Sequence, residues 1–371
     1  MTRFAAHCRV FFVEEPFEAA KDSHLQISVD PSGVVVVTPH IRKGADREAS
    51  LRSLINHLLE TEGVDAYDLW YYTPMAISWT SHMKPRVVVY DCMDELSGFK
   101  NAPSDLRQRE QKLLKRADLV FTGGQSLYEA KREQHRNIYP FPSSVDVLHF
   151  AQARTPMADP DDQKDIPRPR IGFFGVIDER MDLELVAAIA DARPEWQVVM
   201  LGPVVKIDPA ALPVRPNIHY LGMKTYAMLP QYLAGWDAAI LPFARNESTR
   251  FISPTKLLEY LAAGRPVVST SIRDVVKPYG ECGVVSVADE PEEFVRAIEK
   301  EMQLDRESRQ HEINTLLSRT SWNHTWGRMR ELIENSVQKK EWLTQETGKR
   351  PLSRAAGAGA GRTAPLRWSH V

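Results

Sequence analysis

Lys256 and Glu259 are the side chains whose types and spacing point most directly to chemistry. They stand three residues apart in the stretch SPTKLLEYLAAGRPVVST, residues 253–270, so on a helix they share one face. Ser253 is a good N-cap and Pro254 suits the first helical position, which places Lys256 in the first turn. Free N–H groups and a lysine at a helix start favour a phosphate. A carboxylate one turn later can accept hydrogen bonds from two sugar hydroxyls, so the pattern predicts a nucleoside diphosphate site.

A lysine and a glutamate at this spacing also occur as a solvated surface pair. The surroundings favour the binding site. The helix follows a strand-like run at 237–243 and a polar loop, and it ends at Gly264 before a further strand. Loops from strand to helix at the carboxyl edge of a parallel sheet are where open α/β sheets bind ligands.

The composition is that of an ordinary globular protein. The chain has 371 residues, of which 43% are hydrophobic and 26% charged, enough for two domains. The formal net charge of −2 gives no electrostatic reason to expect nucleic acid. Three cysteines without paired spacing fit a reducing cytosol better than disulfides or a zinc site. No apolar run is long enough to span a bilayer and no signal peptide is visible, so we expect a cytoplasmic protein.

Short β-branched runs alternate with amphipathic helical patterns, which predicts βαβ units and parallel sheets in an α/β protein. The expected parts are a first domain at 1–153, a polar and proline-rich linker at 154–169, and a second domain at 170–319. An aromatic-rich helix at 320–343 is expected to pack back on the first domain, and a basic tail at 344–371 to be disordered. Predicted strands of the first domain are Arg9–Val13, Val34–Thr38, Asp68–Tyr72, Val87–Tyr90, Leu119–Thr122 and Asn137–Phe141; those of the second are Arg170–Phe174, Gln197–Leu201, Ile218–Leu221, Ala238–Pro242 and Val284–Val287.

Two such halves, with SPTKLLEYLAAGRPVVST in the second, resemble the GT-B glycosyltransferases of the family 4-like, group 1 type. The matching stretches are RADLVFTGGQSLYEAK (116–131), FPSSVDVLHF (141–150), RIGFFGVID (170–178) and NIHYLGMKTYAMLPQYLAGWDAAILPF (217–243). Their order and spacing are specific together, although no single piece is. The resemblance implies two Rossmann-like domains facing a cleft. It implies transfer of a hexose from a nucleoside-diphosphate sugar, which is a substrate and not a cofactor, to a glycan or lipid-linked acceptor in cell-envelope or exopolysaccharide synthesis.

By this resemblance the second domain holds the donor. Glu259 would take the ribose hydroxyls, and Lys256 with the N–H groups of Thr255 and Lys256 would neutralise the diphosphate. Ser253 at the helix start would also belong to the donor site. Charge develops on the leaving phosphate, so donors placed there in advance stabilise the transition state. There is no metal-ligand cluster in the sequence, and metal-independent transfer is expected, with Lys256 and the helix start in place of a cation.

The turns of the second domain would complete the donor site. Gly175 would let the backbone approach the diphosphate, although it also suits a simple turn. Gly222 and Tyr226 would face the base, although tyrosines in such loops are more often packing residues. Many members of the family carry a glutamate eight residues before the ribose-binding one, where this chain has Phe251.

A basic residue that often follows the glycine turn in this family is replaced by Val176. Arg180 and Arg250 are the candidates to stand in for it. Members of this group usually begin with a further strand and helix before the equivalent of RVFFVEEP. The first domain is therefore expected to lack its initial strand and helix, either because the start is internal or because the chain is truncated.

The first domain should hold the acceptor. In YDCMDEL (90–96), Asp91 and Asp94 follow a buried type of strand and are candidates for a catalytic base or for orienting sugar hydroxyls. Capping of the next helix is the alternative role for Asp94. His40 occupies an equivalent strand end and is a further candidate, although loop histidines are usually inert.

Two other functions remain open from the sequence. A nucleotide-sugar epimerase of the same fold would need acid and base residues in both halves, and the donor-half loops are poor in them. A truncated, non-catalytic binding protein would follow from the missing first strand. The basic tail would also allow a weak peripheral contact with the inner face of an anionic membrane.

Overall fold

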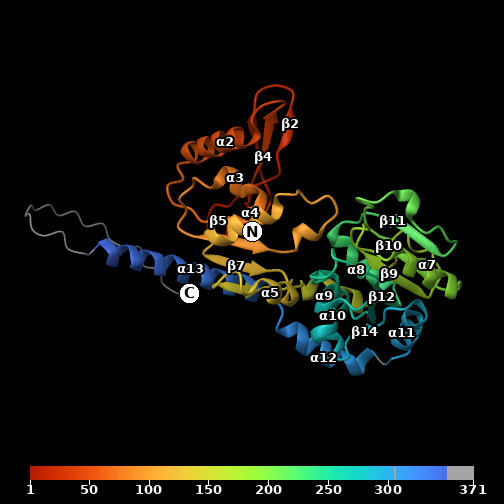
Figure 1. Ribbon diagram of the computed structural model, residues 1–371. Coiled ribbons are helices and arrows are strands. Elements are labelled where there is room, and N and C mark those ends of the chain that lie inside the picture. The colour runs from red at the N-terminus through yellow and green to blue at the C-terminus, as the bar shows by residue number, and fades with distance from the viewer. Residues whose placement is uncertain (305, 349–371) are drawn as a thin grey trace, which may run out of the picture.

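The computed structural model describes residues 1–304 and 306–348 (Figure 1). The chain forms two α/β domains, and the last helix returns from the second domain to the first (Figure 1). The first domain contains two four-stranded sheets, and the second contains one sheet of six strands.

The first sheet is mixed. β1 (Phe11–Val13) and β2 (Phe17–Ala19) run parallel to β4 (Val35–Arg42), and β3 (His24–Val29) runs antiparallel to it. The helix α2 (Arg47–Thr61), whose N-cap is Asp46, packs on it through an apolar cluster around Val37. We did not predict β2 and β3: β2 is only three residues long, and the alternation of Leu25, Ile27 and Val29 with polar residues in β3 was missed. Both strands expose most of their side chains. A short helix, α1 (Thr2–Ala5), precedes β1.

The second sheet of this domain is parallel, in the order β5-β6-β7-β8. Its strands match four of the predicted ones closely: β5 (Leu69–Tyr71), β6 (Val88–Cys92), β7 (Leu119–Thr122) and β8 (Ile138–Pro140). The main helices are α3 (Ile77–Thr80), α4 (Leu106–Arg116) and α5 (Gln125–Lys131), with short turns η1 (Pro74–Ala76) and η2 (Leu96–Gly98). The predicted strands of the first domain are thus divided between two sheets.

The second domain has a six-stranded parallel sheet in the order β11-β10-β9-β12-β13-β14. The strands are β9 (Arg170–Phe174), β10 (Gln197–Leu201), β11 (Ile218–Gly222), β12 (Ala238–Leu241), β13 (Val267–Ser269) and β14 (Ser286–Val287). The helical elements are α7 (Leu183–Ala192), η4 (Pro209–Ala211), η5 (Tyr226–Met228), α8 (Leu229–Ala234), α9 (Thr255–Ala262), α10 (Arg273–Val275), η6 (Val276–Gly280), α11 (Pro291–Gln303) and α12 (Arg306–Ser318). Apolar clusters cover both faces of this sheet, as parallel sheets require.

Two segments connect the domains. The first comprises α6 (Val147–Ala151), η3 (Gln152–Arg154) and residues 155–169. The second is α13 (Trp322–Gly348), whose Ile333 packs against Phe121 and Val89 of the second sheet. The helix runs five residues beyond the predicted limit of 343, and the rest of the predicted tail, 349–371, lies outside the described residues.

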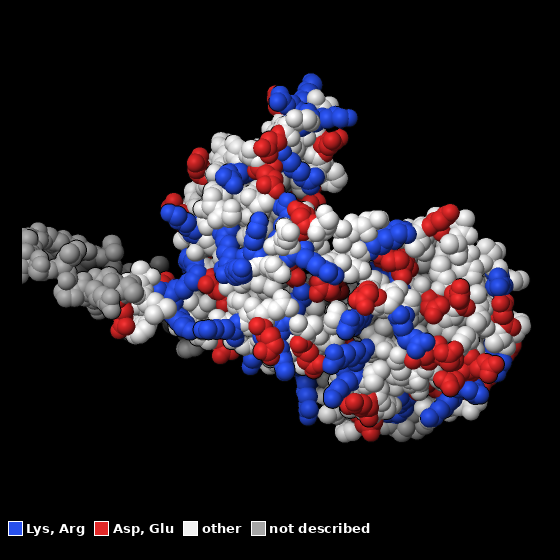
Figure 2. All heavy atoms as spheres, viewed as in Figure 1, with Lys and Arg blue, Asp and Glu red and all other residues white. Residues whose placement is uncertain are grey.

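The carboxyl ends of β6 and of β9 lead into loops that meet across the domain boundary. Phe99, in the loop after β6, lies 5.7 Å from the guanidinium of Arg180 and 5.1 Å from the ammonium of Lys206. Figure 2 shows the surface hollowed between the upper part of the first domain and the second domain, with acidic and basic side chains interspersed over both.

Candidate functional site

Three neighbouring strands of the second domain end in glycines with positive φ. Gly175 follows β9 with φ 141°, Gly202 follows β10 with φ 137°, and Gly222 ends β11 with φ 70°. A Cβ at Gly202 would lie 1.9 Å from the carbonyl oxygen of Gly175, and a Cβ at Gly175 would lie 1.9 Å from Cε of Lys256. Glycine is therefore required at both positions, and Lys256 lies directly over the turn after β9.

Lys256 and Glu259 lie one turn apart on α9, as predicted, and both are partly buried. Burial lowers the pKa of Lys256, while Glu259 opposes that shift. Burial raises the pKa of Glu259 to about 7 against the opposing charge of Lys256. Within residues 1–304 and 306–348, neither side chain makes a hydrogen bond or an ion pair with the protein; the ammonium of Lys256 contacts only the ring of Phe173, at 5.9 Å. The two charges are thus available to a ligand.

The start of α9 differs in one detail from the prediction. The helix begins at Thr255 with Pro254 as its N-cap, and no side chain caps it. Ser253 is therefore not the N-cap; its Cβ lies 2.9 Å from the position that a Cβ on Gly124 of the first domain would take. Gly264 ends the helix with φ 68°, as expected. In the described chain, no backbone partner is found for the N–H groups of Thr255 and Lys256.

Arg180 lies beside this site but is held by its own domain. Its guanidinium forms a two-pronged ion pair with Asp178, at 2.7 Å for the shorter contact. Its charge, with that of Lys256, lowers the pKa of Asp94, which burial raises overall. Arg180, Lys256 and Asp94 are therefore brought together across the domain boundary, although Asp94 is far from the other two in the sequence.

The two aspartates after β6 are separated. Asp91 is buried against the indole of Trp70, which donates a hydrogen bond of 3.2 Å to its Oδ2. Its Oδ1 has no partner in the described structure, and burial raises its pKa to about 7. Alternation along a strand explains this: Asp91 shares the face of Val89, and Tyr90 and Cys92 point to the other. Asp91 thus sits in the packing of the first domain rather than beside Asp94.

His40 lies away from Lys256 and Asp94. It is on β4, where its ring stacks on His24 at 4.8 Å and on Phe17 at 5.9 Å, and it meets the amide of Gln26 at 3.2 Å. All of these contacts belong to the first sheet. The sequence showed that His40 is near a strand end but not that this strand belongs to a separate sheet.

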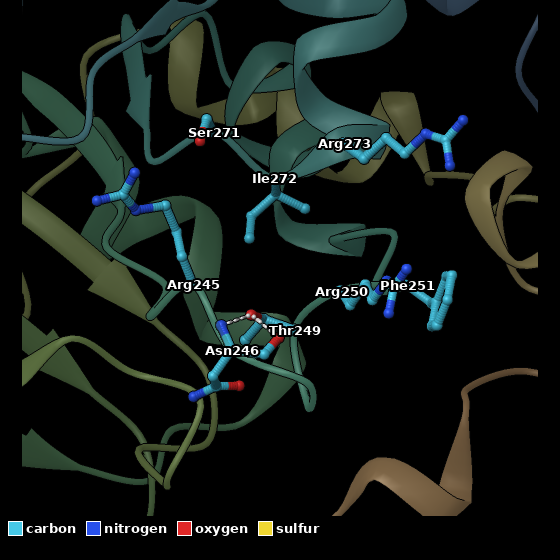
Figure 3. Close-up of a pocket in the computed structure, with 8 residues that line it drawn as sticks. All are labelled: Arg245, Asn246, Thr249, Arg250, Phe251, Ser271, Ile272 and Arg273. Atoms are coloured by element: carbon cyan, nitrogen blue, oxygen red, sulfur yellow. Dashed lines mark hydrogen bonds between the residues drawn. The ribbon is translucent and has the colours of Figure 1, made fainter.

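Arg250 and Phe251 line a pocket of about 240 Å³ between the loops after β12 and β13 (Figure 3). Arg250 is paired with Glu247 at 3.5 Å and is largely exposed. The other arginines of the pocket, Arg245 and Arg273, point away from each other in Figure 3. Phe251 packs against the apolar cluster of the second sheet of the first domain. The position where relatives were expected to carry a glutamate is therefore a contact between the domains, and Arg250 is not beside Lys256.

Tyr226 lies near Glu259, whose charge contributes to raising its pKa to about 12, after burial as the main cause. Its ring is about half exposed and stacks on His149 at 4.4 Å. Nε2 of His149 also lies 3.0 Å from the carbonyl oxygen of Tyr226. Our sequence reasoning did not select His149, although it lies in the quoted stretch FPSSVDVLHF that leaves the first domain.

Comparison with known proteins agrees with this geometry. Residues 168–303 match the family model described as Glycosyl transferases group 1. The second domain is a group 1 glycosyl transferase domain. The chain is 26% identical over 279 residues to a protein of Bacillus subtilis (strain 168) named as the teichuronic acid biosynthesis glycosyltransferase TuaH. That match covers 69% of this chain and 68% of the relative.

Solved structures with the same fold are glycosyltransferases with the GT-B architecture. Trehalose-6-phosphate synthase OtsA matches with a TM-score of 0.66 over 90% of this chain and 92% of its own, at 12% identity. Anabaena HepE in complex with UDP and glucose matches with a TM-score of 0.54 over 77% of this chain and 87% of its own, at 15% identity. The predicted fold class and the resemblance are thereby confirmed, and this glycosyltransferase has two Rossmann-like domains.

Among the described residues, no three or more His, Cys, Asp or Glu side chains are grouped so that they could hold a metal ion. In the same part of the chain, no helix combines the length and the apolar composition needed to cross a membrane.

Proposed function

We propose that this glycosyltransferase moves a sugar from a nucleoside-diphosphate sugar to a glycan or lipid-linked acceptor in cell-envelope polysaccharide synthesis. The observation that carries the proposal is the pair Lys256 and Glu259 beside the turn at Gly175. Both charges are partly buried and have no protein partner among the described residues. Leaving buried charges unpaired is costly, and an anionic, hydroxyl-rich ligand would pair both.

In the proposed complex, the diphosphate lies over Gly175 against the ammonium of Lys256 and the free N–H groups that begin α9. Glu259 accepts hydrogen bonds from the ribose hydroxyls, and Tyr226 meets the base. Gly222, at the same edge of the sheet, lets the backbone approach the base closely. Arg180 contributes positive potential without a direct contact, because Asp178 holds its guanidinium.

The proposed reaction is substitution at the anomeric carbon. The acceptor hydroxyl oxygen forms a bond to that carbon, and the bond from the carbon to the diphosphate oxygen breaks. The nucleoside diphosphate leaves with the bonding electrons, and the hydroxyl proton passes to the carboxylate of Asp94. Lys256 and the helix start stabilise the charge on the leaving group, which is the role we predict in place of a metal ion.

The acceptor class rests on the name of the relative TuaH, which is that of a teichuronic acid biosynthesis glycosyltransferase. We therefore propose a polysaccharide or its lipid-linked precursor as the acceptor. A cytoplasmic location with a peripheral membrane contact stays a prediction, since the basic residues invoked for it fall at 349–371, outside the described residues.

Binding of UDP, GDP, TDP and ADP to the full chain tests the donor site directly. We expect one diphosphate to raise the Tm, and Lys256→Met and Glu259→Gln each to weaken its Kd by about tenfold or more, as loss of a charged contact implies. The matched controls are the same two substitutions at exposed positions, Lys164→Met and Glu293→Gln, and both variants should bind the diphosphate as the wild type does. Normal binding by both site variants would refute the assignment. Release of a free epimerised nucleotide sugar without any acceptor would favour the epimerase instead.

A further inference from the structure

A buried lysine joins two glutamates beneath the loop that carries Asp94. Lys131, the last residue of α5, is 3% exposed, and its Nζ lies 2.7 Å from Oε2 of Glu95 and 2.8 Å from Oε1 of Glu110. Glu110 also accepts a hydrogen bond of 2.8 Å from the hydroxyl of Tyr90. Glu95 accepts one of 2.7 Å from Ser97. The network thereby ties the loop after β6 to α4, α5 and β6 itself.

The lysine stays charged in this site. Burial alone would lower the pKa of Lys131, but Cys92 and Glu110 outweigh it and the pKa is raised. The pKa of Glu95 is lowered, because hydrogen bonds from Lys131 and Ser97 overcome its burial. Buried ion pairs of this kind often stabilise a fold no more than apolar side chains of the same size would. Stability is therefore a weak reason for this network, and fixing the loop is a stronger one.

The loop has little other freedom. Gly123 passes so close beneath it that a Cβ there would lie 2.2 Å from the carbonyl oxygen of Met93. Asp94 stands between Met93 and the anchored Glu95, and its pKa responds to Arg180 and Lys256 of the second domain. A shift of the Glu95 anchor would move the Asp94 carboxylate relative to these two cations.

We propose that Lys131 is a positioning residue for the transfer reaction: through Glu95 it holds the carboxylate of Asp94 against the donor half of the site. This rests on the proposed function, in which Asp94 takes the acceptor proton. Lys131 itself touches no substrate, since it is buried within the first domain.

The test is the neutral variant with Glu95→Gln, Lys131→Met and Glu110→Gln, which leaves no buried charge unpaired and should keep the fold. A misplacement of ~1 Å can cost about 100-fold, so we expect kcat to fall by about 10- to 100-fold. The KM for the donor and the Kd for the nucleoside diphosphate should stay within about twofold, because those contacts belong to the second domain. Lys131→Arg, which keeps the charge, should recover part of kcat, and Tm measurements check the fold.

Wild-type kcat in the folded neutral variant would overturn this inference and leave the proposed function intact. A loss of nucleotide affinity equal to the loss of kcat would also overturn it, because a general loss of structure would then explain both. If the wild type itself neither binds a nucleoside diphosphate nor transfers a sugar, the proposed function fails first and this inference with it.

Discussion

At the scale of single residues, the partly buried carboxyl group of Glu259 leads to a prediction about pH dependence. Its folded pKa, about 7, lies above the ordinary 4.5. A raised carboxyl pKa gives stability that is present below pH ~4.5 and is lost as the pH rises through about 7. In thermal melts without ligand, Glu259→Gln should match the wild type at pH 5 and exceed its Tm at pH 8. The exposed control Glu293→Gln should show no such trend; an equal Tm difference at both values of pH would contradict the shift.

Gly175 gives a second prediction at this scale. In Gly175→Ala the new Cβ would meet Lys256 at 1.9 Å, so the lysine must leave its place over the turn. Nucleoside diphosphate affinity should fall by more than about tenfold, which corresponds to about 1.4 kcal/mol. Gly283→Ala, in the same domain but outside the proposed donor site, is the matched control, because its φ is also positive and nothing lies within 4 Å of the new Cβ. This control also places an alanine at a positive φ, so equal affinities of the two variants in a calorimetric titration would refute the steric argument.

The residues predicted best are those whose roles are local. Lys256 and Glu259 share a helical face through their spacing alone, and Gly175 follows a strand that its own sequence defines. Asp91 and Asp94 could not be ranked from the sequence, because their roles depend on where β6 ends: Asp91 lies within the strand and is buried, and Asp94 lies in the loop that follows. The ion-pair partners of Lys131, Glu95 and Glu110, lie on other elements far from it in the sequence. No sequence pattern around Lys131 therefore predicts the buried ion pairs.

At the scale of elements, the segment 155–169 is not a free linker. Gln163 is fully buried, accepts a hydrogen bond of 2.9 Å from the indole of Trp236, and donates to Asp159 at 3.0 Å and to the Tyr232 carbonyl at 3.1 Å. Gln163→Ala leaves the buried indole N–H of Trp236 unpaired. The Tyr232 carbonyl keeps the Gly235 N–H, and Asp159 keeps Arg170. The substitution should therefore cost about 1–3 kcal/mol of unfolding free energy. Urea unfolding would measure this, with the exposed Lys164→Ala as the neutral neighbour. Equal urea midpoints for the two variants would show that the segment only connects the domains and does not stabilise the second one.

The elements themselves were largely predictable wherever a strand is buried on both faces. β7 and β9 have the predicted limits, because continuous apolar runs bounded by turns leave little choice. The acidic and proline-rich composition of 154–169 suggested a solvated linker, yet the ion pair of Asp159 with Arg170 binds it to the second domain. That partner could not be seen without the fold. β2 is too short to show a pattern, whereas the alternation in β3 was there to be read and was overlooked.

At the scale of the whole molecule, the two domains meet at several places, and charged side chains take part in at least two of them. Phe99 lies by Arg180 and Lys206 on one side. On the other, the carboxylate of Asp274 on α10 accepts a hydrogen bond of 2.9 Å from the Ser126 N–H at the start of α5. Arg273 pairs with Glu129 beside it. Figure 1 places α5 next to α9 and α10, where the chain also crosses between the domains in α12 and α13.

Asp274 therefore caps a helix of the other domain, and its removal should loosen the domain contact. A Cβ on Gly124 would lie 2.1 Å from its Oδ2, so the carboxylate is seated tightly against the helix start, and burial raises its pKa. Asp274→Ala would lose a capping interaction worth about 1–2 kcal/mol. The radius of gyration from X-ray scattering should rise, whereas nucleoside diphosphate affinity should stay within about twofold because Lys256 and Glu259 are untouched.

Asp274→Asn keeps an acceptor oxygen, so its radius of gyration should lie between those of the wild type and Asp274→Ala. Glu129→Gln, which breaks only the more exposed pair, should leave the scattering unchanged. If Asp274→Ala scatters as the wild type does, the domains are held by the apolar contacts of Phe251 and the capping carboxylate is incidental.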